Sequence, residues 1–345
     1  MCLVSIHNEW DRLEEVIVGR VDNARIPIAD ISLHAIEYEH HALAELIPSG
    51  PFPKKVIEET FEDLEILCDQ LKKLGIVVRR PNIFDHNMVV QTPYWSTNGF
   101  YNYCPRDVFV TVGNTIIEAP MTLRSRQFES LSYKDHLVEY MKSGASWVSA
   151  PKPVLEDKSY DVTAPAGNRL LDLEPIFDAA NTLRIGKDIL YLVSDSGNAL
   201  GCKWLQNFLG KSYTVHPMKN LYAKTHIDST IMVLRPGLVL LNPSRVDKNN
   251  CPLIFKKWDK IWCPNMIDVG YTTEPYSSEW IGMNLLMIDL DIAIVEKVQK
   301  PLINALEKHK INVIPLSLRH SRTLGGGFHC VTLDIRRKGQ LEQYD

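Results

Sequence analysis

One cysteine, one histidine and several carboxylates, far apart in the sequence, could together perform covalent chemistry. Cys330 comes shortly after three consecutive glycines, Gly325, Gly326 and Gly327. A thiol is a strong nucleophile only as the thiolate, and a histidine such as His226, oriented by a carboxylate, could activate it. Glycines let the backbone adopt unusual angles and approach a ligand closely. A free cysteine in a core strand is more often inert, but such a strand does not need this glycine run, which therefore favours a functional Cys330.

The other cysteines and histidines give weaker signals. The remaining cysteines are widely spaced and predict neither a disulfide framework nor a zinc site: Cys2, Cys68, Cys104, Cys202, Cys251 and Cys263. Of these, Cys104 alone lies near a candidate site. No zinc-binding spacing fits the group His34, Glu37, Glu39, His40 and His41, so we expect a solvated loop or helix there, without metal. We expect His329 to be on the face of a strand opposite to Cys330 and do not predict it as the base.

A pair of short β-rich runs joined by a tight polar turn recurs along the chain. Residues 108–112 and 115–118 flank one such turn, and similar pairs occupy 182–193, 230–241 and 285–295, with a less regular start at 13–19. β-branched residues on both sides of a polar turn are typical of hairpins. These pairs therefore predict an antiparallel strand pair in each segment.

Helical segments and a further strand follow most of these pairs. Apolar spacing predicts helices over 54–74, 127–142, 198–209 and 299–309, and short strands follow at 76–78, 213–215 and 311–314. In the first helix one apolar face carries Phe61, Leu64, Leu67, Leu71 and Leu74. The recurring unit is strand–strand–helix–strand, about five times over, and a closed ring of such units buries its strands. We therefore predict one domain over residues 1–345, of α/β class, as a five-fold pseudo-symmetric propeller; a plain α+β sheet is the alternative.

Polar residues fall at equivalent places in this repeat. Carboxylates precede the second and third hairpins, a histidine and a carboxylate open the fourth, and two serines precede the fifth: Asp107, Asp178, His226, Asp228, Ser277 and Ser278. Equivalent positions in a ring converge on its axis, so these residues and Cys330 should meet at one mouth. An active site needs several ionisable groups brought together in this way.

Composition and charge exclude several classes of protein. The formal net charge is −4, so nucleic acid is not an expected partner. There is no run of about 18 apolar residues, so no membrane span is expected. The apolar stretch before Glu9 is too short for a signal peptide, and widely spaced cysteines, odd in number, suit a reducing compartment. We expect a cytoplasmic protein that acts on small molecules.

Six segments resemble the amidinotransferase family, and the resemblance covers nearly the whole chain. The relatives are arginine:glycine and arginine:inosamine-phosphate amidinotransferases, and toxin-pathway members such as that of saxitoxin also belong to the family. That family has a pentein-like α/β propeller and commonly forms dimers, so the resemblance implies this fold and a homodimer. The matching segments are 8–11 (NEWD), 104–107 (CPRD), 174–180 (EPIFDAA), 226–230 (HIDST), 324–330 (LGGGFHC) and 334–337 (DIRR).

The resemblance also implies a role for each candidate residue. Cys330 would be the nucleophile, His226 the general acid and base, and Asp178 its carboxylate partner. Asp107 and Asp228 would grip the substrate guanidinium, which suits its five N–H donors and permanent charge. Further substrate contacts would come from Arg245, which would hold the α-carboxylate of L-arginine, and from Ser277 and Ser278. The amidino group would pass to Cys330, L-ornithine would leave, and an amine acceptor would take the group, without metal or organic cofactor.

Two alternatives use the same groups. If water attacked the amidino group instead of an amine, the protein would be an arginine deiminase-like hydrolase that produces citrulline. A chain without catalytic activity would be a guanidinium-binding protein.

Glycine-using members carry asparagine and methionine where this chain has Ala223 and Thr225. These smaller residues predict an acceptor pocket for an amine larger than glycine, and a role in secondary metabolism; an arginine:glycine amidinotransferase is the alternative.

Overall fold

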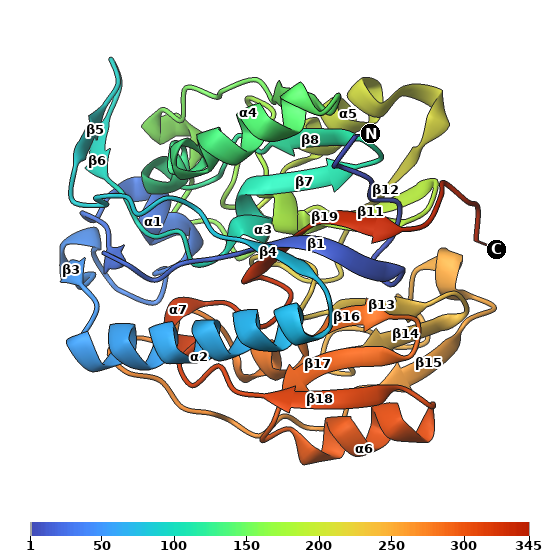
Figure 1. The fold of residues 1–345 in the computed structure, drawn as a ribbon. Coiled ribbons are helices and arrows are strands. Elements are labelled where there is room, and N and C mark those ends of the chain that lie inside the picture. Colours follow the sequence, from blue (N-terminus) through green and yellow to red (C-terminus); the bar gives the residue numbers. More distant parts are fainter. Residues whose placement is uncertain (1, 345) are drawn as a thin grey trace.

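The computed structural model describes residues 2–344, and Figure 1 shows their arrangement. The helices are α1 Ile31–Ile36, α2 Lys54–Lys73, α3 Pro105–Val108, α4 Lys134–Lys142, α5 Ala199–Leu209, α6 Lys300–Lys308 and α7 Ser321–Leu324. The strands are β1 Arg12–Val18, β2 Arg25–Ile26, β3 Gly50–Pro51, β4 Val77–Arg79, β5 Val89–Gln91, β6 Ser96–Asn98, β7 Phe109–Val112, β8 Thr115–Glu118, β9 Ser146–Ser149, β10 Thr182–Ile185, β11 Asp188–Leu192, β12 Thr214–Met218, β13 Ile231–Arg235, β14 Leu238–Leu241, β15 Asp259–Trp262, β16 Leu286–Asp289, β17 Ile292–Glu296, β18 Asn312–Leu316 and β19 Thr332–Lys338. Among these residues, no helix combines the length and the apolar character that a membrane crossing requires.

Within residues 2–344, five three-stranded sheets repeat one pattern. Each has an antiparallel strand pair whose second strand pairs in parallel with a third, in the orders β19-β1-β4, β7-β8-β9, β10-β11-β12, β13-β14-β15 and β16-β17-β18. A parallel pair requires a crossover, and helices α2, α4, α5 and α6 supply it in four units. Only a 3₁₀ helix, Leu253–Phe255, lies between β14 and β15. The repeated unit and the α/β class agree with the prediction; the arrangement round a five-fold axis stays a prediction.

The first sheet is built from both ends of the chain. Strand β1 pairs antiparallel with β19, and the two lie side by side in Figure 1. This explains why the run 13–19 has no hairpin partner next to it in the sequence: its partner is Thr332–Lys338. The N- and C-terminal segments are therefore held together by one ladder of hydrogen bonds.

Three local predictions need correction. Phe61 is 43% exposed, because it lies on the solvent side of α2 and not on the buried face of Leu64, Leu67 and Leu71. The predicted helix over 127–142 begins as α4 only at Lys134, since a 3₁₀ helix occupies Glu129–Tyr133. His329 and Cys330 do not lie on a strand, because residues 328–331 form a turn and β19 begins at Thr332. The alternation argued for His329 therefore does not apply.

A cluster of buried charges joins several of these units. Arg184 of β10 binds Glu9 through Nε and Nη2, at 2.8 and 2.7 Å. The carboxylate of Asp334 on β19 accepts hydrogen bonds from Arg184 at 3.2 Å, from Arg106 at 2.7 Å and from Arg337 at 2.9 Å. All five side chains are buried, and the arginines hold the pKa values of both carboxyl groups below their usual range despite burial. We call these five residues the central ion cluster.

We predict that Asp334→Asn destabilises the protein by about 3–5 kcal/mol, because it leaves buried arginines without their counter-charge. Urea unfolding followed by circular dichroism measures this loss. The matched control is Glu58→Gln on α2, whose ion pair with Lys54 is exposed and should contribute about 0.5 kcal/mol or less. Equal stability of the two variants would contradict a structural role for the central ion cluster.

Candidate active site

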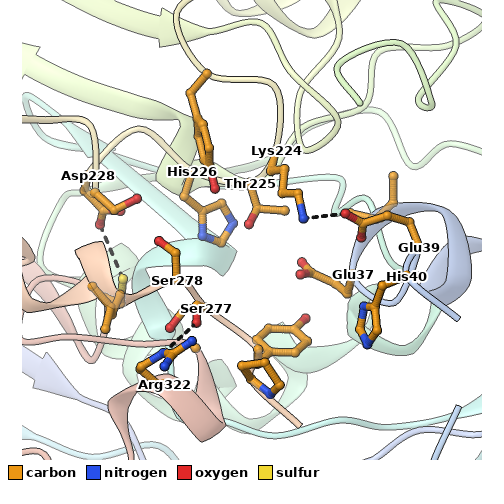
Figure 2. A pocket seen from close by; sticks show the side chains of 18 residues that line it. Glu37, Glu39, His40, Lys224, Thr225, His226, Asp228, Ser277, Ser278 and Arg322 are labelled. Atoms are coloured by element: carbon orange, nitrogen blue, oxygen red, sulfur yellow. Dashed lines mark hydrogen bonds and ion pairs between the residues drawn. The ribbon is translucent and has the colours of Figure 1, made fainter. Parts of the chain in front are cut away.

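A cavity of about 350 Å³ brings together segments that are far apart in the chain (Figure 2). Of the residues predicted for the site, those in its lining are Thr225, His226, Asp228, Ser277, Ser278 and Cys330. Asp107, Asp178 and Arg245 lie behind this lining and contact it through His226 and Ser278. Ala223 lies outside it and lines a neighbouring depression, where its Cβ lies next to Gly167.

Cys330 is held by the turn that precedes β19. Its backbone N–H donates to Oδ1 of Asn284 at 3.1 Å, and Asn284 also accepts from the N–H of His329 at 2.9 Å. Gly325 has a φ of +75°, a backbone conformation that would be strained in a residue with a side chain. A Cβ at Gly326 would lie 2.5 Å from Sγ of Cys104 and 3.3 Å from Cβ of Cys330. A Cβ at Gly327 would likewise lie 2.6 Å from Cβ of Asn284, so all three glycines occupy positions that disfavour a side chain. Asn284 was not predicted.

The thiol of Cys330 has a strongly polar surrounding. Its Sγ donates to Oδ2 of Asp228 at 3.4 Å. Contact with Cys104, burial, and the negative charges of Asp228 and Asp107 raise the pKa of the Cys330 thiol well above its ordinary value. Cys330 is therefore a protonated thiol at neutral pH. A cationic ligand beside these carboxylates would favour the thiolate.

His226 is bracketed by carboxylates. Its Nε2 lies 3.1 Å from Oδ2 of Asp178, and its Nδ1 lies 3.6 Å from Oδ1 of Asp107. Burial opposes its protonation, but the charge of Asp107, the hydrogen bond and charge of Asp178, and the charge of Asp228 raise the pKa of His226 to about 9. Its φ of +62° is unusual for a residue with a side chain, and such backbone strain is found preferentially at functional sites.

The two carboxylates beside His226 are themselves fixed. Oδ1 of Asp178 accepts hydrogen bonds from the backbone N–H and the hydroxyl of Thr122, both at 2.9 Å. Asp107 accepts from Arg126 at 2.8 Å through Oδ2, while its Oδ1 has no hydrogen-bond partner among residues 2–344. Asp178 can therefore orient the imidazole, and Asp107 keeps an acceptor available. Thr122 and Arg126 carry no motif that would have marked them in the sequence.

Asp228 is connected to the central ion cluster through His329. Nδ1 of His329 lies 2.8 Å from Oδ2 of Asp228, and Nε2 lies 3.2 Å from Oε2 of Glu9. Burial opposes ionisation of Asp228, but the hydrogen bond and charge of His329, with the charge of His226, lower its pKa to about 2. Asp228 is therefore a carboxylate at neutral pH. His329, predicted to point away from the site, instead positions one of its acids.

Arg245 is a half-buried cation that has no counter-charge in the described part of the chain. It donates to the backbone carbonyl and hydroxyl of Ser229, to Oγ1 of Thr230 and to Oγ of Ser278, at 2.8–3.1 Å. Its guanidinium carbon lies 3.5 Å from the ring centroid of Tyr222. Among residues 2–344 no carboxylate pairs with it, and burial lowers its pKa. An anionic group of a ligand could complete this environment.

The opposite wall of the cavity comes from residues that were not predicted as part of the site. Glu37, Glu39 and His40 follow α1, and Lys224 and Arg322 complete the charged lining. Lys224 contacts Glu39, and Arg322 binds Asp268 at 2.6 Å. The sequence had grouped Glu37, Glu39 and His40 as a solvated segment. Their spacing gave no sign that they face a cavity, because the cavity is formed by distant segments.

A group that could bind a metal lies at the edge of the cavity. His40 Nε2 and His41 Nε2 lie 3.1 and 3.6 Å from the carboxylate of Glu274, and the three ligand atoms lie within 4.8 Å of one another. The rings of His40 and His41 thus contact the carboxylate of Glu274 directly. Nothing in the arrangement of Cys330 and His226 requires a metal ion for nucleophilic chemistry.

The geometry joins a thiol, an imidazole and carboxylates, which suits attack on a cationic carbon centre. Comparison identifies the family. Inosamine-phosphate amidinotransferase 1 of Streptomyces glaucescens is 57% identical over 346 residues, covering 100% of this chain and 99% of that protein. The chain belongs to the amidinotransferase family. No protein-family model matches it.

Two solved structures of this family share the fold along the whole chain. The inosamine-phosphate amidinotransferase of Streptomyces griseus superposes with a TM-score of 0.99 at 59% identity, covering 100% of this chain and 99% of the other. A saxitoxin-pathway amidinotransferase from Microseira wollei gives a TM-score of 0.93 at 40% identity and covers 100% of both chains. The family resemblance given by the six sequence segments is thereby confirmed.

We predict that the imidazole of His226 titrates near pH 9 and that Asp178→Asn lowers its pKa. The variant removes a negative charge and a hydrogen bond that both favour the protonated ring. Histidine side-chain NMR measures the titration, and the signal lost in His226→Asn identifies the ring. His216→Asn, whose ring pairs with Asp188 at another place, serves as the control for assignment. An unchanged His226 pKa in Asp178→Asn would contradict the described electrostatics.

Proposed function

We propose that the protein transfers the amidino group of L-arginine, through an amidino-Cys330 intermediate, to an amine acceptor larger than glycine, and releases L-ornithine. The proposal rests on one observation: negative and positive charges lie at different positions around the same cavity. Asp228 provides negative charge beside Cys330, and Arg245 provides an uncompensated positive charge beside Ser278. The guanidinium and the α-carboxylate of arginine match these two places.

In the donor half-reaction the guanidinium binds beside Asp228 and Asp107. Its charge favours the thiolate, the thiol proton is released to solvent, and the sulfur attacks the guanidinium carbon. His226, protonated at neutral pH, gives its proton to the leaving nitrogen. The C–N bond breaks, L-ornithine leaves and the amidino group stays on sulfur. Asp178 would hold the imidazole in position, and Arg245 with Ser277 and Ser278 would hold the amino-acid end.

In the acceptor half-reaction an amine attacks the amidino carbon. His226, now neutral, takes one proton from the attacking nitrogen, the C–S bond breaks and Cys330 leaves as thiolate. The inosamine-phosphate relatives support an inosamine phosphate, a phosphorylated amino-cyclitol, as the first candidate acceptor. Thr225 in the cavity lining is a small side chain that leaves room for such a ring. A role in secondary metabolism, a cytoplasmic location and a homodimer belong to this proposal.

We predict that arginine without an acceptor adds an amidino group to Cys330. Intact-protein and peptide mass spectrometry would detect the mass gain, and Cys330→Ala should neither gain mass nor turn over. Agmatine, which lacks the α-carboxylate, should label poorly because Arg245 would remain unpaired in the occupied cavity. Cys202→Ala is the matched control, because that buried thiol lies on α5 outside the cavity. A fully active Cys330→Ala protein would end the proposal.

We predict that larger primary amines compete better than glycine for the amidino-enzyme. Because glycine does not fill the cavity beside Thr225, it should be poorly oriented and react slowly. Competition between glycine and an inosamine phosphate, with arginine as donor, measures the preference. The double change Ala223→Asn, Thr225→Met should shift it toward glycine. Preference of the unmodified protein for glycine would indicate a guanidinoacetate-forming enzyme, and citrulline as the main product would indicate a hydrolase.

A further inference from the structure

Glu37 presents a carboxylate without a partner to the cavity. It follows α1 directly, and its backbone N–H donates to the carbonyl of Leu33 at 3.1 Å, which fixes its place at the helix end. Its side chain is half-buried, and Figure 2 shows it pointing into the cavity. Among residues 2–344 no donor or cation pairs with it, so its carboxyl group is available to a ligand.

Glu39, from the same wall, differs in this respect. Its carboxylate contacts Lys224 and lies 3.6 Å from Nη1 of Arg169. Two residues of the same type, two positions apart, therefore have different states: Glu39 is compensated by two cations and Glu37 by none. If these two residues only made the wall acidic, there would be no reason for one to be paired and the other unpaired. In the view of Figure 2, Glu37 and Asp228 lie on opposite sides of the cavity, with His226 between them.

The proposed reaction contains one proton that the described groups do not accept. An alkylamine arrives as an ammonium ion, which has no lone pair to attack with. It must lose one proton before attack and a second after the new C–N bond forms. His226 is neutral at that stage and can take one proton only. Asp178 is occupied by Thr122 and His226, and Asp228 by His329 and Cys330. The free Oδ1 of Asp107 is taken, in the proposed reaction, by the N–H groups of the amidino group that the same carboxylate binds in the donor.

We propose that Glu37 binds the ammonium group of the acceptor and takes its first proton. This rests on the proposed amidino transfer and extends it to the acceptor side of the cavity. The acceptor class is therefore an amine that enters protonated. One N–H bond of the ammonium breaks and its electron pair stays on nitrogen. The proton goes to a carboxylate oxygen of Glu37, and the free amine attacks the amidino carbon.

The charges around Glu37 suit this role. Burial is the largest influence and raises its pKa to about 8, and the charges of Asp178 and Glu39 also raise it, while His226 and Arg126 lower it. Lys224, Tyr38, Tyr222 and Tyr276 also face it. A base whose pKa lies near the working pH can accept a proton and release it again. A bound ammonium would favour the carboxylate, and loss of the proton to Glu37 would remove both charges.

Two acceptors of different basicity test this assignment. An inosamine phosphate enters as an ammonium ion, whereas hydroxylamine is already unprotonated at neutral pH. Amidino-Cys330 is first formed with arginine, and its decay is then followed by rapid mixing with each acceptor. Glu37→Gln should slow decay with the inosamine phosphate by about 10²-fold or more, and change decay with hydroxylamine by less than about threefold. The burst of ornithine from arginine should keep its rate and its arginine dependence.

Each other outcome overturns the assignment. Equal slowing of both acceptors would give Glu37 a packing or binding role without proton transfer. A raised arginine requirement in the ornithine burst would place Glu37 on the donor's α-ammonium group. Glu39→Gln removes the same charge from the same wall, so an equal loss in that variant would assign the effect to net charge. Absence of the burst from the unmodified protein would overturn the amidino transfer itself, and the role of Glu37 with it.

Glu37→Ala provides a second measurement. If proton acceptance is the lost function, added formate should restore part of the decay rate with the inosamine phosphate, because it can occupy the vacated space as a base. It should not accelerate decay with hydroxylamine. Lack of recovery together with equal slowing of both acceptors would overturn the proposal, whatever the folding state of the variant.

Discussion

The requirement that buried charges be paired organises this molecule from its centre to its active site. Arg106, Arg184, Arg337, Glu9 and Asp334 are all removed from water, and each has an opposite charge within hydrogen-bonding distance. Such groups are costly to bury singly and tolerable together. Because they come from separate units, their pairing fixes how those units meet. His329 extends the same pairing to Asp228, which contacts the nucleophile. The position of an active-site carboxylate thus depends on ion pairs in the core.

At the active site, by contrast, some charged groups have no partner among the described residues. Cys330 and His226 lie among carboxylates, which favour a protonated imidazole and a protonated thiol. Within residues 2–344, no anion pairs with Arg245 and no cation pairs with Glu37. A substrate with charges at both ends would supply what these groups lack. Binding of the substrate, its orientation and activation of the thiol would then have one cause: the substrate neutralises charges that the fold already holds in place.

The sequence was sufficient for features with a local pattern. Turn residues between β-rich runs revealed the repeated strand pairs, and the glycines before Cys330 marked an unusual backbone. It was insufficient wherever a residue acts through a distant partner. β1 looked irregular because its partner is β19, and Phe61 matched helical spacing although the neighbouring surface leaves it exposed. The partners that hold site residues, such as Thr122, Arg126 and Asn284, have no motif.

The acceptor side of the cavity shows the same limit. In the sequence Glu37 and Glu39 are acids among histidines, and their spacing matches no zinc site, so it predicts no function for them. What distinguishes them is contact with Lys224 and Arg169, which come from segments far along the chain. The roles of the site residues remain predictions that chemistry must test. The structure adds the particular carboxylates and donors that surround each of them.

The pairing of β1 with β19 also has a consequence for synthesis. During translation β1 is made before the other strands of the five three-stranded sheets, and β19 after them. β1 can therefore pair with β4 early, while its other edge stays unpaired until β19 has been made. Contacts between such distant segments slow folding, and an unpaired strand edge can associate with other chains during that time. The turn that presents Cys330 immediately precedes β19. The nucleophile and the strand that completes the first sheet therefore emerge together, after the strands of the other four three-stranded sheets.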